Sequence, residues 1–159
     1  MSEATTTRRK AFGVLVITPV YRDWDSAALL CRNLDECCGQ LPDVEVRVLM
    51  VDDGSPDGMK GWQPFEPKQI LSLEALFLRR NLGHQKAITT ALCYVDAQMK
   101  CDAVLVMDAD GEDRPDDAMR LIQLAMEGPP RVIFAERRKR LESRVFRAGY
   151  RMYRLLHRV

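Results

Sequence analysis

The sequence predicts an α/β fold with a mostly parallel sheet flanked by helices on both faces. Short runs of Val, Ile and Leu alternate along the chain with segments whose apolar residues recur at helical spacing. Strands that alternate with helices in this way are typical of βαβ units, whose strands run parallel. With 159 residues, of which 47% are hydrophobic, the chain is long enough for one modest core.

Five apolar segments are predicted to form the strands of this sheet. They are residues 13–18 (GVLVIT), 44–51 (VEVRVLMV), 74–80 (EALFLRR), 102–107 (DAVLVM) and 131–135 (RVIFA). Their β-branched residues favour extended backbone, and their near-continuous apolar character is typical of strands covered on both faces.

Helices are predicted between and after these strands, at residues 25–38, 83–99, 115–126 and 142–157. Leu29, Leu30 and Leu34 share one face of the first, and Pro115 stands in the first turn of the third, where proline is favoured. Residues 54–67 are rich in Gly and Pro and predict a loop. The expected organisation is a disordered tail at 1–11, an α/β domain at 12–136 and a basic amphipathic helix region at 137–159.

Charge and cysteine content narrow the class of protein. The net charge is only +1, so no global field favours nucleic acid as a partner. Five cysteines, an odd number without a CxxC pair, are expected to be reduced thiols of a cytoplasmic protein. No apolar run approaches the roughly 18 residues that span a bilayer.

Polar residues follow the predicted strands. Because parallel strands end at a common edge, where α/β folds bind ligands, these segments are expected to form one site. They are residues 18–22, 52–55, 79–83, 108–110 and 136–138.

Asp108 and Asp110 are the strongest candidates for a metal site. Two carboxylates one residue apart repel each other unless a cation lies between them, and oxygen ligands favour Mg²⁺ or Mn²⁺. Glu112 is expected to add a third oxygen. The alternative is that Asp113 caps the helix at Pro115 and the other acids form a solvated turn.

Two further segments offer binding groups. Asp52 and Asp53 form either a plain Asp-Gly turn or a carboxylate acceptor for a nucleobase or ribose. Gly83 and Lys86 open a helix whose free amides and added charge suit an anion. His84 is expected to be a surface or capping residue. No dinucleotide or P-loop glycine pattern is present.

The last predicted helix has arginines at one side, with spacing 3, 4, 3, 4, beside a large apolar face. Such a helix lies either on an anionic membrane surface or against the sheet with its arginines in solvent. The arginines are Arg144, Arg147, Arg151, Arg154 and Arg158.

Four stretches, VITPVYRD, LMVDDGSPDG, LRRNLGHQKAITTAL and VMDADGEDRP, resemble in order and spacing the family 2 glycosyltransferases with the GT-A fold. The nearest branch contains dolichyl-phosphate mannose synthase and bacterial polyprenyl-phosphate glycosyltransferases. The resemblance extends over residues 12–158 and implies the Rossmann-like, nucleotide-sugar-binding half of such an enzyme.

The resemblance implies roles for individual residues. Pro19 and Tyr21 would line the nucleotide pocket and Asp52 would contact the base. Asp108 and Asp110 would match the metal and donor-diphosphate motif, where Glu112 replaces the usual glutamine. Two arginines, Arg137 and Arg147, would contact donor phosphate. Asp110 and Arg137 are therefore the catalytic candidates.

The resemblance also implies a function. A sugar would pass with inversion from a UDP- or GDP-sugar to an acceptor, a polyprenyl phosphate, at the inner face of the membrane. The chain ends before the family's acceptor half, so the alternative is a non-catalytic nucleotide-sugar-binding or interaction module. A nucleotidyltransferase is disfavoured, because TPVYRDWD lacks the Gly-rich phosphate loop that follows the first strand in those enzymes.

Overall fold

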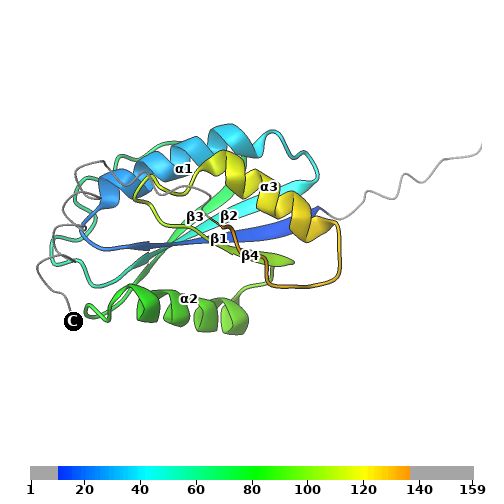
Figure 1. Ribbon diagram of the computed structural model, residues 1–159. Coiled ribbons are helices and arrows are strands. Elements are labelled where there is room, and N and C mark those ends of the chain that lie inside the picture. Colours follow the sequence, from blue (N-terminus) through cyan, green and yellow to red (C-terminus); the bar gives the residue numbers. More distant parts are fainter. Residues whose placement is uncertain (1–10, 137–159) are drawn as a thin grey trace, which may run out of the picture.

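The fold is a four-stranded parallel sheet with three helices, seen in a computed structural model that describes residues 11–136. Its strands are β1 (Phe12–Val20), β2 (Val44–Asp52), β3 (Ile70–Phe77) and β4 (Ala103–Val106), in the order β3-β2-β1-β4. Its helices are α1 (Trp24–Cys38), α2 (His84–Gln98) and α3 (Pro115–Met126). All three strand pairs are parallel, which confirms the predicted α/β class (Figure 1).

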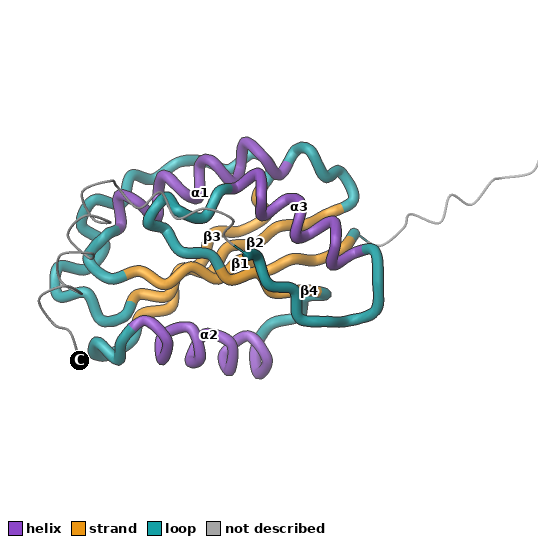
Figure 2. The backbone as a smooth tube through the Cα atoms, in the orientation of Figure 1, coloured by secondary structure: helices purple, strands orange, loops and turns teal. Residues whose placement is uncertain are grey.

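Two apolar layers hold the helices to the sheet. Helices α1 and α3 cover one face and α2 covers the other (Figures 1 and 2). Along β1, Val14 and Val16 pack toward α1 and α3, whereas Leu15 and Ile17 pack toward α2. All four are 0% exposed, because successive side chains of a strand point to opposite faces and both faces are covered.

The structure corrects the prediction for β3. The strand begins at Ile70, four positions before the expected start at 74, and ends at Phe77. The carboxylate of Asp35 on α1 accepts hydrogen bonds from the backbone N–H groups of Lys68, Gln69 and Ile70. Because this contact joins residues far apart in the chain, the local pattern of the strand does not reveal it.

The prediction of a strand at 131–135 is wrong. These residues have no regular structure, and Val132 and Phe134 are 79% and 87% exposed. A β-branched run forms a strand only when a neighbouring strand takes its backbone hydrogen bonds, and in the described part of the chain β4 pairs with β1 alone.

The loop before α3 also differs from one expectation. Arg114 occupies the N-cap position of α3, without a side-chain cap, so Asp113 does not cap this helix. The Asp113 carboxylate instead accepts a 2.9 Å hydrogen bond from the backbone N–H of Asp108. By contrast, Asp23 caps α1 through a hydrogen bond from the N–H of Ser26.

The remaining expectations concern the loop at 54–67, the cysteines, a membrane span and the last predicted helix. Residues 54–67 form neither helix nor strand, as predicted, and the five cysteines are free thiols. Burial raises the pKa of Cys31 to about 12. Within residues 11–136, no helix is long and apolar enough to cross a membrane. The helix predicted at 142–157, which includes Arg147, lies outside the described residues, and so does Arg137.

Candidate functional site

The carboxyl ends of the strands bring most of the predicted site residues to one edge of the sheet. Val20 at the end of β1 lies beside Asp52 at the end of β2, and Asp52 lies beside Phe77 at the end of β3. Pro19 is half-buried in β1, and Tyr21, which follows the strand, is 45% exposed. The strand order places the end of β1 between Asp52 and the loop after β4.

Asp52 is buried, with 3% of its surface exposed. Its Oδ2 accepts a 3.0 Å hydrogen bond from the backbone N–H of Ser55, but its Oδ1 has no partner among the described residues. Two other buried side-chain atoms there also lack partners, Oγ1 of Thr18 and Nε1 of Trp24. Buried polar groups are nearly always satisfied, so such atoms beside a strand end favour a ligand or water there.

The sequence places Thr18 in the expected site segment 18–22 without assigning it a role, and it does not point to Trp24. Trp24 belongs to the apolar layer between the sheet and α1, and its ring packs against Trp62 and Phe77, each with centroids 5.9 Å away. Its side chain appears in the sequence as an ordinary apolar residue at a helix start. Only its burial shows that the indole N–H lacks a partner.

Asp53 has a structural role that can be stated from its contacts. Its Oδ1 accepts from the backbone N–H of Leu82 at 2.7 Å and its Oδ2 from that of Gly83 at 2.9 Å. The carboxylate, 3% exposed, therefore joins the loop after β2 to the start of α2. Its predicted contact with substrate stays a prediction.

The start of α2 lies at the same edge of the sheet. Gly83 has φ 89, a left-handed conformation that favours glycine, and Lys86 on the first turn is exposed. His84 Nε2 lies 3.5 Å from Asp108 Oδ1, with the two side chains 48% and 36% exposed. His84 thus has a partner in the predicted metal motif. This pairing depends on the path of α2 across the sheet, which the sequence does not show.

The loop after β4 holds the predicted metal ligands. Asp110 Oδ1 accepts a 2.9 Å hydrogen bond from the backbone N–H of Glu112, and both residues are exposed. In the part of the chain that the structure describes, no three His, Cys, Asp or Glu side chains are grouped to hold a metal ion. Mg²⁺ often uses one or two carboxylates together with substrate phosphates, so the oxygens of Asp108 and Asp110 suit it chemically.

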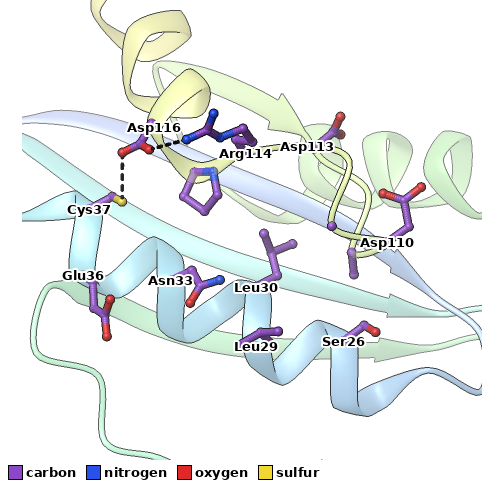
Figure 3. Close-up of a pocket in the computed structure, with 13 residues that line it drawn as sticks. Ser26, Leu29, Leu30, Asn33, Glu36, Cys37, Asp110, Asp113, Arg114 and Asp116 are labelled. Carbon is purple, nitrogen blue, oxygen red and sulfur yellow. Dashed lines mark hydrogen bonds and ion pairs between the residues drawn. The ribbon is translucent and has the colours of Figure 1, made fainter. Parts of the chain in front are cut away.

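A cavity of about 480 Å³ lies between α1 and the loop before α3 (Figure 3). Its lining includes Ser26, Asn33, Cys37 and Asp110, but neither Asp52 nor Asp108. Asp110 therefore borders the α1 side, whereas Asp108 contacts the first residue of α2, the helix on the opposite face. This cavity is lined by Asp110 and not by Asp108, and the predicted shared metal site of the two carboxylates stays a prediction.

At one end of this cavity Asp116 connects two side chains (Figure 3). Its carboxylate lies 3.4 Å from the guanidinium of Arg114 and accepts a 3.7 Å hydrogen bond from the thiol of Cys37. Burial, followed by the negative charge of Asp116 and this hydrogen bond, raises the pKa of the Cys37 thiol. The thiol is therefore kept protonated and is a poor nucleophile.

Comparison of the chain with known proteins identifies its family. The pattern of the family described as Glycosyl transferase family 2 matches residues 15–158. Proteins named undecaprenyl-phosphate 4-deoxy-4-formamido-L-arabinose transferase are similar to the chain. Those of Klebsiella pneumoniae, Erwinia tasmaniensis and Proteus mirabilis are 31%, 32% and 31% identical to it over 148, 116 and 134 residues.

These alignments take in 91%, 72% and 82% of the chain but only 43%, 34% and 38% of the respective relatives. The chain thus spans less than half the length of the relatives it matches. Since the family pattern extends over most of the chain and agrees with the parallel α/β fold, the chain belongs to glycosyl transferase family 2.

Proposed function

We propose that the chain binds the donor in a glycosyltransferase that moves a sugar, with inversion, from a nucleoside diphosphate to a polyprenyl phosphate. The family supports glycosyl transfer, and the names of the relatives support an undecaprenyl phosphate acceptor. The observation that carries the donor site is the buried Oδ1 of Asp52, which has no partner among the described residues.

In this proposal different strand ends contact different parts of the donor. Asp52 accepts a hydrogen bond from the base, and Pro19 and Tyr21 form the adjacent wall. Asp53 holds the loop before α2, Gly83 allows close backbone approach there, and Lys86 with the start of α2 offers positive charge to an anionic part of the donor. Arg137 and Arg147 bind donor phosphate.

In this proposal the diphosphate of the donor lies against the loop after β4. Asp108 and Asp110, with Glu112, would hold Mg²⁺ or Mn²⁺, which would supply positive charge to offset the negative charge of the departing nucleoside diphosphate. The hydrogen bond from the Asp108 N–H to Asp113 and the contact with His84 fix the position of Asp108. Asp108 would then offer a carboxylate with a neighbour at 3.5 Å, and Asp110 an exposed one.

A polyprenyl phosphate suits this set of residues as acceptor. Its phosphate oxygen is already ionised near neutral pH, so no general base is required. The proposed place is the cytoplasmic face of the membrane, with the basic amphipathic segment 142–158 on the lipid surface.

A second candidate function is nucleotide-sugar binding without transfer. It requires only the donor edge of the sheet, with the buried Oδ1 of Asp52 that has no partner among the described residues. Incubation with labelled UDP- and GDP-sugars and undecaprenyl phosphate separates the candidates. Formation of a lipid-linked sugar supports transfer, and donor binding without product supports the second candidate.

Calorimetric titration with UDP and GDP, with and without Mn²⁺, tests the donor site. We expect binding of one nucleotide to depend on Mn²⁺ and to be lost in Asp110→Asn. Asp57→Asn, an exposed acid in the loop after β2, is the matched control and should bind as the parent does. Binding by Asp110→Asn with unchanged affinity would remove Asp110 from the site.

Flotation with liposomes tests the membrane contact. We expect the parent chain to bind vesicles containing anionic lipid, and a variant with Arg151→Glu and Arg154→Glu to bind them less. Absence of binding by the parent chain contradicts the interfacial helix.

A further inference from the structure

Arg22 has an unusual backbone conformation for its residue type. Its φ is 60, the left-handed region, and in residues 11–136 every other positive φ belongs to a glycine. A side chain with a Cβ is strained there, and glycine or asparagine would adopt it at lower cost. Such strain is commonly found at functional sites, where the surrounding structure holds it.

The contacts that hold Arg22 lead directly to Asp52. The backbone N–H of Arg22 donates a 2.8 Å hydrogen bond to Oγ of Ser55. The backbone N–H of Ser55 in turn donates to Oδ2 of Asp52 at 3.0 Å. The strained residue is therefore tied to the carboxylate proposed to bind the base.

The side chain of Arg22 points its charge at a ring rather than at an acid. Its guanidinium carbon lies 5.6 Å from the centroid of the Tyr21 ring, and both residues are exposed. No ion pair of Arg22 is found in the described part of the chain. Stacking on an aromatic face leaves the edge of the guanidinium, with its N–H donors, available to another group.

Strand order places Arg22 between the two ends of the proposed donor site. Arg22 follows β1, and β1 lies between β2, which ends at Asp52, and β4, which precedes Asp108 and Asp110. Neighbouring strands are about 4.8 Å apart, so β2 and β4 are separated by about 10 Å. A nucleotide has a comparable distance between its base and its phosphates, and Arg22 follows the strand between the two ends.

We propose that Arg22 binds the diphosphate of the nucleotide donor. This inference rests on the proposed function and adds a residue within the described fold to the phosphate-binding arginines. The planar guanidinium pairs with phosphate oxygens through two parallel hydrogen bonds, which explains why an arginine is kept at a strained position. Tyr21 pre-orients it by stacking.

Calorimetric titration with UDP, GDP, uridine and guanosine in the presence of Mn²⁺ tests this assignment. The variant is Arg22→Asn, because asparagine tolerates the left-handed conformation and has no charge. The matched control is Arg32→Asn on α1, which also removes a guanidinium that lies 5.6 Å from an aromatic ring, that of Phe65. Melting temperatures are measured for both.

We expect Arg22→Asn to raise the Kd of the nucleoside diphosphate about tenfold or more, as for loss of a charged hydrogen bond. The Kd of the matching nucleoside should not change, and the melting temperature should stay equal or rise. The control should bind both ligands as the parent does. Arg22→Lys should recover part of the diphosphate affinity.

Two results overturn the assignment while leaving the donor site intact. One is unchanged diphosphate affinity in Arg22→Asn. The other is an equal loss for nucleoside and diphosphate together with a lower melting temperature, which would mean that Arg22 only shapes the loop. If the parent chain binds neither UDP nor GDP, the proposed donor site itself is refuted, and this inference with it.

Discussion

His84 Nε2 lies 3.5 Å from Oδ1 of Asp108, so the first residue of α2 contacts the residue that begins the DAD sequence after β4. The contact crosses the carboxyl edge of the sheet on the face that α2 covers. It gives Asp108 a neighbour able to donate a hydrogen bond and thereby restrict the orientation of the carboxylate.

Replacement of His84 by Ala is expected to weaken Mn²⁺-dependent nucleotide binding about three- to tenfold, the usual worth of one partly exposed hydrogen bond. His84→Gln keeps an N–H donor and should retain more affinity. Titration of Mn²⁺ and nucleotide into each variant measures the effect. Equal affinities for parent and His84→Ala would show that the contact has no role in binding.

Asp53→Ala should destabilise the fold by about 2 kcal/mol or more, because two backbone N–H groups lose a buried charged acceptor. Urea unfolding followed by circular dichroism measures this loss. Asp57→Ala, at an exposed position of the same loop, should change stability by less than about 0.5 kcal/mol. Similar midpoints for the two variants would contradict the role assigned to Asp53.

Gly54→Ala should be more destabilising than Gly58→Ala, although both glycines have positive φ, 73 and 58. A Cβ at position 54 would lie 2.6 Å from the backbone nitrogen of Asn81, whereas a Cβ at 58 meets nothing within 4 Å. Gly58→Ala adds only the strain of the left-handed backbone, about 1 kcal/mol. Gly54→Ala must in addition push the loop after β2 away from the backbone at residues 80 and 81. Thermal unfolding of both variants compares them, and equal losses would exclude the steric part.

Asp35 gives the fold a pH dependence in the acid range. Burial alone raises the pKa of Asp35, but the N–H groups of Lys68, Ile70 and Gln69 and the charge of Lys68 outweigh it, so the pKa lies below its ordinary 3.8. A lowered pKa means that the ionised carboxylate stabilises the folded state. This stability is fully present above pH 3.8 and is lost as the pH falls through the folded pKa.

Asp35→Asn should therefore be less stable than the parent at about pH 6, and the difference should narrow below about pH 4. Urea unfolding across this range measures it. Glu36→Gln, at an adjacent exposed acid on α1, is the control and should leave the pH dependence in place. A constant difference between the parent and Asp35→Asn at every pH would mean that ionisation of Asp35 is not coupled to folding.

The amino-acid sequence by itself determined the class of fold and the edge at which to look for a site. Apolar runs such as Val14–Ile17 and the helical spacing in α1 are local patterns, and each depends only on neighbours within a few positions. Once the strands are parallel, their polar successors must share an edge, so Tyr21, Asp52, Gly83 and Asp108 could be grouped without coordinates.

Only the tertiary structure decided which of these groups meet. Asp113 holds the N–H of Asp108 instead of capping α3, His84 lies beside Asp108, and residues 131–135 form no strand. The unpartnered oxygen of Asp52 and the strained backbone of Arg22 are equally invisible in the sequence. The reason is that hydrogen bonds, burial and strain depend on strand order and helix path, which bring together residues from distant parts of the chain.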